Sequence, residues 1–164
     1  MINIQSKQLG QENYYGKEGF FFRFIGPDGK REMSVSSDVS SSDTALLLAG
    51  VLTAGKYFGG DIQEKANQIF SNVAWAYLLN LTVEQFYKGW NPEAGLIQQM
   101  WDCPSDEILL INILAIASDP QNQDFLKGYY GFSRNKNNYV SAGQTFSLYN
   151  SYSGSLSAYI LAHC

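Results

Sequence analysis

Three carboxylates stand where loops lead into apolar stretches of the sequence. Asp38 and Asp43 lie at the entry to the run at residues 43–54, and Glu107 opens the run that follows Pro104. Glycosidic bonds are usually cleaved by such a pair, in which one carboxyl is protonated to assist the leaving group and the other activates water or attacks the sugar. Because Asp43 and Glu107 belong to different predicted helices, they are the leading catalytic candidates, with Asp38 as the third.

Helix capping explains the same placement without any catalytic role. An acidic residue in the first helical turn is stabilised by the helix dipole by about 0.3–1 kcal/mol. A helix N-terminus also favours the ionised carboxylate, whereas a general acid needs a raised pKa. Asp43 and Glu107 are therefore easier to assign as bases than as acids, and a structural role stays open for both.

Aromatic residues flank a turn in the middle of the chain. Trp90 and Trp101 lie on either side of the sequence NPEAG at residues 91–95, and the C–H face of a sugar stacks well on such rings. Both tryptophans fit a sugar platform or a hydrophobic core, and Glu93 in the turn fits either hydroxyl binding or solvation. Trp75 lies inside a predicted helix, so we expect it in the core.

The composition excludes several other kinds of site. The chain has 164 residues, 45% of them apolar, a net charge of −4, and no run of Lys or Arg that would attract nucleic acid or an anionic membrane. Cys103, Cys164 and the single histidine, His163, form no zinc or disulfide pattern. A nucleophilic Cys103–His163 pair is a minor alternative. We therefore expect no metal and no cofactor.

Helix signals dominate the elements that must position these residues. Residues 43–54 read as a buried helix too short to cross a bilayer, residues 61–77 as a second helix with one apolar stripe, and residues 108–117 as a third, capped by Ser105. The serine-rich residues 34–42 read as an ordered loop that supplies a cap. We expect the first two helices to form an antiparallel hairpin.

Extended segments are predicted between and after these helices. Residues 20–25 and 31–35 flank a Gly-Pro-Asp-Gly turn and read as a β-hairpin, and residues 88–101 read as another hairpin or a long loop. Residues 127–143 are rich in Gly, Tyr and Asn, and residues 145–162 fit a strand, a helix or both. Helical hairpins joined by long aromatic loops are typical of an (α/α) toroid, whose loops at one end form the binding cleft.

Four ordered blocks resemble the glycoamylase-like family of bacterial (α/α)6 barrels. They are SSDTALLLAGVLTAGKYFGGD, NVAWAYLLN, GWNPEAGLIQQMWD and DEILLINILAIASDP, and the match covers residues 14–120. The family pattern has an acid before an Asp that opens an apolar helix, a Gly-Trp-x-Pro-Glu-x-Gly loop, and a Trp shortly before a Glu that begins a helix. Asp43 and Glu107 match the acidic residues of the cleft, and Asp38 matches an acid that is usually Glu.

The resemblance implies a metal-free glycoside hydrolase that acts on a glucan, either glucoamylase-like or β-1,2-glucanase-like, with Trp90, Glu93 and Trp101 lining the sugar site. It also implies a periplasmic or secreted location, although residues 1–10 show no signal peptide. Cys103-Pro104-Ser105 replaces the usual Tyr, and the segment at residues 146–157 lacks the family's His and Asp-x-Arg, with Gly154 in place of the His. A glycan-binding protein that has lost catalysis is therefore the first alternative. A transglycosylating domain like that of cyclic β-1,2-glucan synthases is the second.

The expected architecture is mainly α: a partial (α/α) toroid of antiparallel helical hairpins with short β-hairpins in the loops. Twelve helices of about 11–12 residues with connections of about 4–6 need on the order of 200 residues. We therefore expect residues 1–164 to form one domain that is a fragment of a larger barrel, completed by a missing part or by a partner chain.

Overall fold

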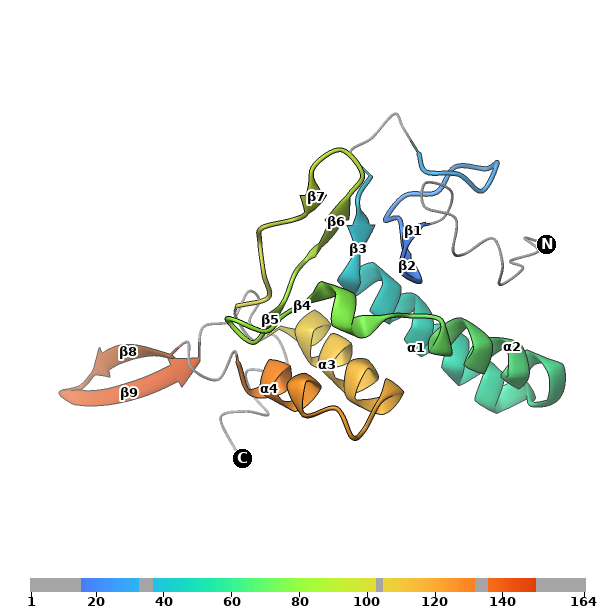
Figure 1. Cartoon of the computed structure of the whole chain (residues 1–164). Helices are drawn as coiled ribbons and strands as arrows, with labels where there is room; N and C mark the ends of the chain where they lie inside the picture. Colours follow the sequence, from blue (N-terminus) through green and yellow to red (C-terminus); the bar gives the residue numbers. More distant parts are fainter. Residues whose placement is uncertain (1–15, 33–36, 103–104, 132–135, 150–164) are drawn as a thin grey trace. The chain divides into compact units, whose positions relative to one another are not determined.

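The computed structural model describes residues 16–32, 37–102, 105–131 and 136–149. The chain divides into two compact units: Met1–Leu78 with Tyr87–Gln99, and Leu79–Phe86 with Met100–Cys164. Across the described residues there are four α-helices, one 3-10 helix and nine short strands in four antiparallel sheets (Figure 1). Each unit is described separately below.

The architecture is a mixture of α and β, so the prediction of a mainly helical partial toroid is wrong. Each unit contains one pair of consecutive α-helices together with small sheets. The two most apolar stretches are helical, as predicted. The fold class was wrong because the strands were missed, and most of them are only two or three residues long. A strand of that length is too short to show the alternation by which strands are recognised in a sequence.

Strand pairs in the first unit surround the start of its long helix. β1 (Gly16–Lys17) pairs with β2 (Phe20–Phe21), and β3 (Val39–Ser40), β6 (Gly89–Asn91) and β7 (Gly95–Leu96) form a three-stranded sheet in the order β3-β6-β7. The predicted turn at residues 91–95 is confirmed as the β6–β7 connection.

The predicted hairpin at residues 20–35 is only partly correct. The chain does reverse around residues 26–30, where Ile25 bridges Arg31. Upstream of that turn, however, β2 pairs with β1, and Phe22 bridges Val39. Residues 33–36 lie outside the described ranges.

The two helices of the first unit are α1 (Ser41–Phe58) and α2 (Gly60–Ser71), and they confirm the predicted helical hairpin. The prediction of a fully buried helix at residues 43–54 is wrong, since α1 is longer and Leu46 is 56% exposed. Gly59, with φ of 68°, ends α1 and starts the turn. Gly55 lets the helices approach closely, because a Cβ there would lie 2.6 Å from the Cβ of Ala66. The predicted second helix was too long, since α2 stops at Ser71.

A 3-10 helix, η1 (Trp75–Leu78), follows α2 after a short break. Trp75 is 1% exposed and packs edge-on against Phe20 at a centroid distance of 5.4 Å. This confirms Trp75 as a core residue, although it lies in η1 and not in α2.

The second unit contains α3 (Asp106–Ser118) and α4 (Gln123–Gly131), the β4 (Leu79–Asn80) and β5 (Gln85–Phe86) pair, and a hairpin of β8 (Lys136–Ser141) and β9 (Gln144–Tyr149). The predicted cap is confirmed, because the Ser105 hydroxyl accepts from the Ile108 backbone N–H at 3.3 Å. Sequence analysis missed α4. It left residues 145–162 open, and β9 is a strand, while residues 150–162 lie outside the described ranges.

Candidate functional site

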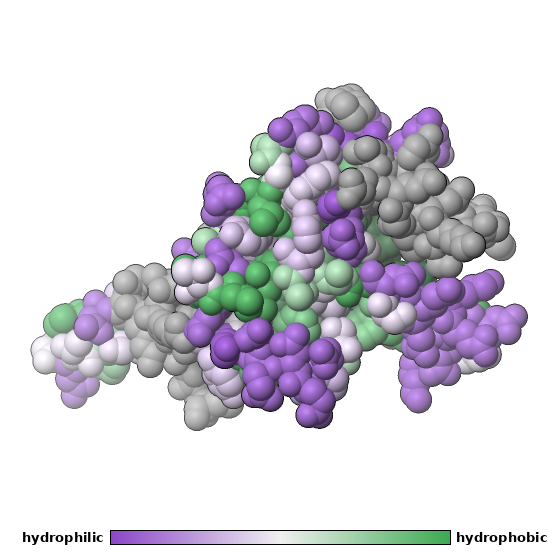
Figure 2. Space-filling view, in the orientation of Figure 1, coloured by the Kyte–Doolittle hydropathy of each residue, from purple (hydrophilic) through white to green (hydrophobic). Residues whose placement is uncertain are grey.

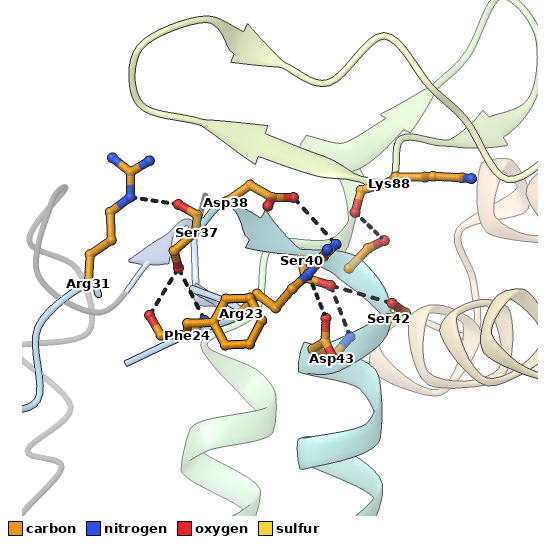
Figure 3. A network of polar contacts seen from close by, with 10 residues as sticks. Arg23, Phe24, Arg31, Ser37, Asp38, Ser40, Ser42, Asp43 and Lys88 are labelled. Carbon is orange, nitrogen blue, oxygen red and sulfur yellow. Dashed lines mark hydrogen bonds and ion pairs between the residues drawn. The ribbon is translucent and has the colours of Figure 1, made fainter. Parts of the chain in front are cut away.

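A cluster of three charged side chains lies where β3 leads into α1 (Figure 3). Arg23 Nη2 lies 3.5 Å from Asp38 Oδ2, and Arg23 Nε lies 3.3 Å from Asp43 Oδ2. The side chains of Arg23, Asp38 and Asp43 are 42%, 14% and 49% exposed, so solvent reaches all three. We call these three residues the Arg23 cluster. Two of the predicted catalytic carboxylates are thus brought together, by a residue that sequence analysis had not singled out.

Backbone pairing positions the cluster. The Arg23 N–H donates to the Asp38 carbonyl at 2.8 Å, next to the bridge between Phe22 and Val39, so Arg23 and Asp38 project from the same side of the paired segments. Asp43 is fixed in the first turn of α1, where its N–H donates to the Ser40 hydroxyl at 3.1 Å. The charged groups are therefore held in place before any ligand arrives.

Serine hydroxyls tie the surrounding loop to the rest of the first unit. Ser37 Oγ accepts from the Phe24 N–H at 3.1 Å and donates to the Phe24 carbonyl at 2.9 Å, and Ser41 Oγ donates to the Lys88 carbonyl at 2.9 Å (Figure 3). The predicted cap is confirmed, since Ser40 is the N-cap of α1, but the predicted loop is wrong for most of residues 37–42, because β3 occupies Val39–Ser40 and α1 begins at Ser41. Residues 34–36 lie outside the described ranges.

Trp90 lies on the other side of the strand from the Arg23 cluster. Trp90 is the register partner of Val39, and side chains alternate along a strand, so Asp38 points away from the face that carries Trp90. The Lys17 ammonium lies 5.7 Å from the centre of the Trp90 ring and 5.9 Å from that of Tyr77. Trp90 is thus brought to a cation and a second ring, and not to the carboxylates.

The neighbouring Tyr77 hydroxyl is also perturbed. Partial burial raises the pKa of Tyr77, and the negative charge of Glu18 raises it further. The phenol is therefore neutral near pH 7 and is available as a hydrogen-bond donor.

Glu93 forms a bidentate ion pair with Arg31, which joins two segments of the first unit that are far apart in the sequence. Arg31 Nη1 and Nη2 contact Glu93 Oε1 and Oε2 at 2.5 and 3.0 Å. Arg31 Nε also donates to the Ser37 carbonyl at 2.6 Å, and its guanidinium lies 5.4 Å from the centre of the Phe22 ring. Glu93 therefore fastens the β6–β7 turn to the segment before β3, a structural role that sequence analysis did not foresee.

We predict that the Arg31–Glu93 pair makes the free energy of unfolding depend on pH in the acid range. The hydrogen bond from Arg31 lowers the pKa of Glu93 below its ordinary value of 4.5. A carboxyl with a lowered folded-state pKa stabilises the fold above its unfolded pKa and loses that effect as the pH falls through the folded value. Melting temperature measured across the acid range should show a gap between wild type and Glu93→Gln at neutral pH that closes well below pH 4.5.

Asp28→Asn is the matched control for this prediction. Asp28 is similarly exposed, at 62% against 60%, but its Lys30 partner is 4.0 Å away and in a neighbouring turn position. The difference in melting temperature between Asp28→Asn and wild type should be smaller at every pH. A Glu93→Gln gap that persists unchanged in acid would contradict the prediction.

The two remaining predicted residues belong to the second unit. Trp101 is 9% exposed, and this burial favours the core interpretation over a sugar platform. Its backbone N–H donates to the Phe86 carbonyl at 2.9 Å. Glu107 is half-buried in the first turn of α3. Since Asp43 belongs to the first unit, neither unit by itself contains the predicted catalytic pair.

The described residues show neither a metal cluster nor a membrane-spanning helix. Among the described residues no three His, Cys, Asp or Glu side chains gather as they would around a metal ion. Cys103, His163 and Cys164 lie outside the described ranges, so the Cys103–His163 alternative is not addressed by the structure. In the same part of the chain, no helix combines the length and the apolar character needed to span a membrane.

The fold and the site together define a mixed α and β protein with a preformed, solvent-accessible cluster of one cation and two anions. Comparison of the chain with protein-family models, with curated proteins and with solved structures found no match. The resemblance to glycoamylase-like proteins therefore stays a prediction.

Proposed function

We propose that the chain binds a neutral glycan through the Arg23 cluster, as the non-catalytic alternative from the sequence suggests. Sugar hydroxyls both donate and accept hydrogen bonds. Asp38 and Asp43 supply acceptors, and Arg23 supplies donors in a fixed fork. The observation that carries the proposal is that one guanidinium is shared between two carboxylates, all three accessible to solvent.

The charge of the cluster selects the class of ligand. Two carboxylates and one guanidinium leave an excess of one negative charge, which disfavours acidic sugars and phosphorylated ligands. A glucan is neutral, in agreement with the ligand class implied by the sequence resemblance.

The same geometry argues against hydrolysis by Asp38 and Asp43. An acid–base pair must accommodate the scissile bond, with a water in the inverting case, between its two carboxyl groups. Here Arg23 lies against both carboxylates at 3.5 and 3.3 Å, so the guanidinium stands where the reacting atoms would have to be. Cleavage that depends on Glu107 remains the second candidate, since this carboxyl is partly exposed in the first turn of α3.

Titration of the whole chain with β-1,2-linked and α-1,4-linked gluco-oligosaccharides tests the proposal by calorimetry. Arg23→Gln and Asp38→Asn should each weaken binding by about tenfold or more, because charge-assisted hydrogen bonds contribute about 1.5–3 kcal/mol. Asp61→Asn is the control, since Asp61 is an exposed acid in the first turn of α2 and lies outside the cluster.

Reducing-sugar release should be followed in the same samples. Binding without release supports the proposal, whereas release that is lost in Glu107→Gln supports the hydrolytic alternative. If neither oligosaccharide binds, or if Asp38→Asn binds as well as Asp61→Asn, the proposal is wrong.

A further inference from the structure

Helix α1 carries apolar surface on two opposite sides. One side is buried, with Ala45 and Leu48 fully covered, where the helix contacts β2 and α2. On the other side Leu46 is 56%, Leu47 44% and Tyr57 82% exposed. A soluble helix normally turns charged residues toward water, and one that is apolar all round is normally covered on all sides.

The exposed residues follow the spacing of a helix–helix seam. Asp43, Leu46, Gly50, Thr53 and Tyr57 are separated by steps of three and four residues, and every one of them is exposed. Between Asp43 and Lys56 the helix has no charged residue. Alternating steps of three and four align side chains along one face that meets a partner helix.

The neighbouring helix shows the contrast. α2 exposes Asp61, Glu64 and Lys65 with one large apolar residue, Ile62, at 48%, and the surface over α2 in Figure 2 is largely hydrophilic. The apolar exposed face is therefore a property of α1 and not of the hairpin as a whole.

The two ends of this exposed face of α1 have complementary shapes. Near the C-terminal end of the helix Leu52, Thr53, Lys56 and Tyr57 line an open hollow of about 680 Å³. Near its N-terminal end Leu46 and Leu47 protrude. Gly50 lies between the two, and a Cβ built there meets nothing within 4 Å, so a partner backbone can approach closely.

Charge fixes the direction of such a pairing. Asp43 lies at the start of α1 and Lys56 in its last turn. Asp43 also pairs with Arg23, but with Asp38 beside them this end of α1 keeps an excess of one negative charge. In an antiparallel pair each Asp43 approaches the Lys56 end of the partner helix, and the helix dipoles are opposed, which is favourable. A parallel pair would place like charges side by side.

We infer that α1 is the interface of a homodimer, in which a second copy of this chain packs its own α1 antiparallel across the region between Gly50 and Thr53. By two-fold symmetry Leu46 of each copy enters the hollow beside Tyr57 of the other. The inference does not rest on glycan binding, but the two surfaces share Asp43, which belongs both to the Arg23 cluster and to the exposed face of α1. It rests on the protruding Leu46, on the hollow beside Tyr57, and on the opposite charges at the two ends of α1.

Sedimentation equilibrium of the whole chain tests the dimer directly. The mass should rise with concentration from 18.3 kDa toward about twice that value. Leu46→Lys should weaken association at least about tenfold, because it would bury a cation beside Lys56 of the partner. Ile113→Lys, at a 51% exposed position on α3, is the control and should associate like wild type.

The circular dichroism of each variant shows whether it still folds. A wild-type mass that stays at 18.3 kDa up to the highest soluble concentration overturns the inference. Equal association of a folded Leu46→Lys variant and wild type overturns it too.

Disulfide trapping tests the antiparallel direction. In a chain with Cys103→Ser and Cys164→Ser, oxidation of a mixture of Leu46→Cys and Tyr57→Cys chains should give cross-linked dimers. Leu46→Cys alone should not cross-link, because the two copies of position 46 lie on the order of 15 Å apart along the helices, beyond disulfide reach. Cross-linking of Leu46→Cys alone, or no cross-link in the mixture, would rule out this pairing.

Discussion

Replacing Gly89 by Ala is expected to destabilise the first unit severely. Gly89 lies in β6 opposite Ser40, and a Cβ at this position would overlap the carbonyl oxygen of Val39. The obstructing atom belongs to the backbone of the paired strand, so no side-chain rotation relieves the overlap. The strands must separate, and we expect a loss of about 3 kcal/mol or more in the free energy of unfolding.

Urea unfolding of wild type, Gly89→Ala and Gly50→Ala measures this effect against a matched glycine. Gly50 is exposed within α1, and a Cβ there meets nothing within 4 Å. At protein concentrations where the chain is monomeric, alanine should stabilise the helix at that position by up to about 1 kcal/mol. Opposite signs for the two variants are the expected result, and a Gly89→Ala midpoint at or above wild type would show that β6 does not approach β3 this closely.

The local parts of the fold could be predicted from the sequence. Ser105 was identified as the cap of α3 and the residues before α1 as the source of a cap, because capping is set by a hydroxyl and an N–H three residues away. The turn at residues 91–95 was also predicted, since Asn, Pro and Gly specify turns by their own backbone preferences.

The contacts between distant segments could not be predicted. The Arg31–Glu93 pair joins residues 62 positions apart, and nothing in the local sequence of either one specifies the other. The same holds for β2, whose two phenylalanines pair with β1 and not across the predicted turn. These errors, together with the missed short strands, produced the wrong fold class.

The candidate site was half visible in the sequence. Asp38 and Asp43 were chosen for their position before an apolar helix, but the cation between them was missed. The sequence around Arg23 does not reveal it, because Phe20, Phe21 and Phe22 are all buried whereas Phe24 is 47% exposed, so there is no alternation of apolar and polar residues to follow. The partners of Arg23 come from a segment 15 to 20 positions further along the chain.

Replacing Phe86 by Ala should have an equally large effect, but in the second unit. Phe86 is fully buried in β5 and stacks on Phe125 of α4 with ring centres 6.4 Å apart and an interplanar angle of 24°. Truncation of a buried phenylalanine leaves a cavity and costs about 3–5 kcal/mol. Leu81→Ala is the control, since Leu81 is 61% exposed in the β4–β5 turn, and it should change stability by no more than about 0.5 kcal/mol.

Amide hydrogen exchange distinguishes where each substitution acts. Phe86 ends the Leu79–Phe86 segment of the second unit, and Gly89 lies just beyond it in the Tyr87–Gln99 segment of the first. Although they are three positions apart, Phe86→Ala should lower protection first in α3 and α4, and Gly89→Ala first in α1 and α2. Uniform loss of protection in all four helices by either variant would mean that the chain unfolds as one cooperative body.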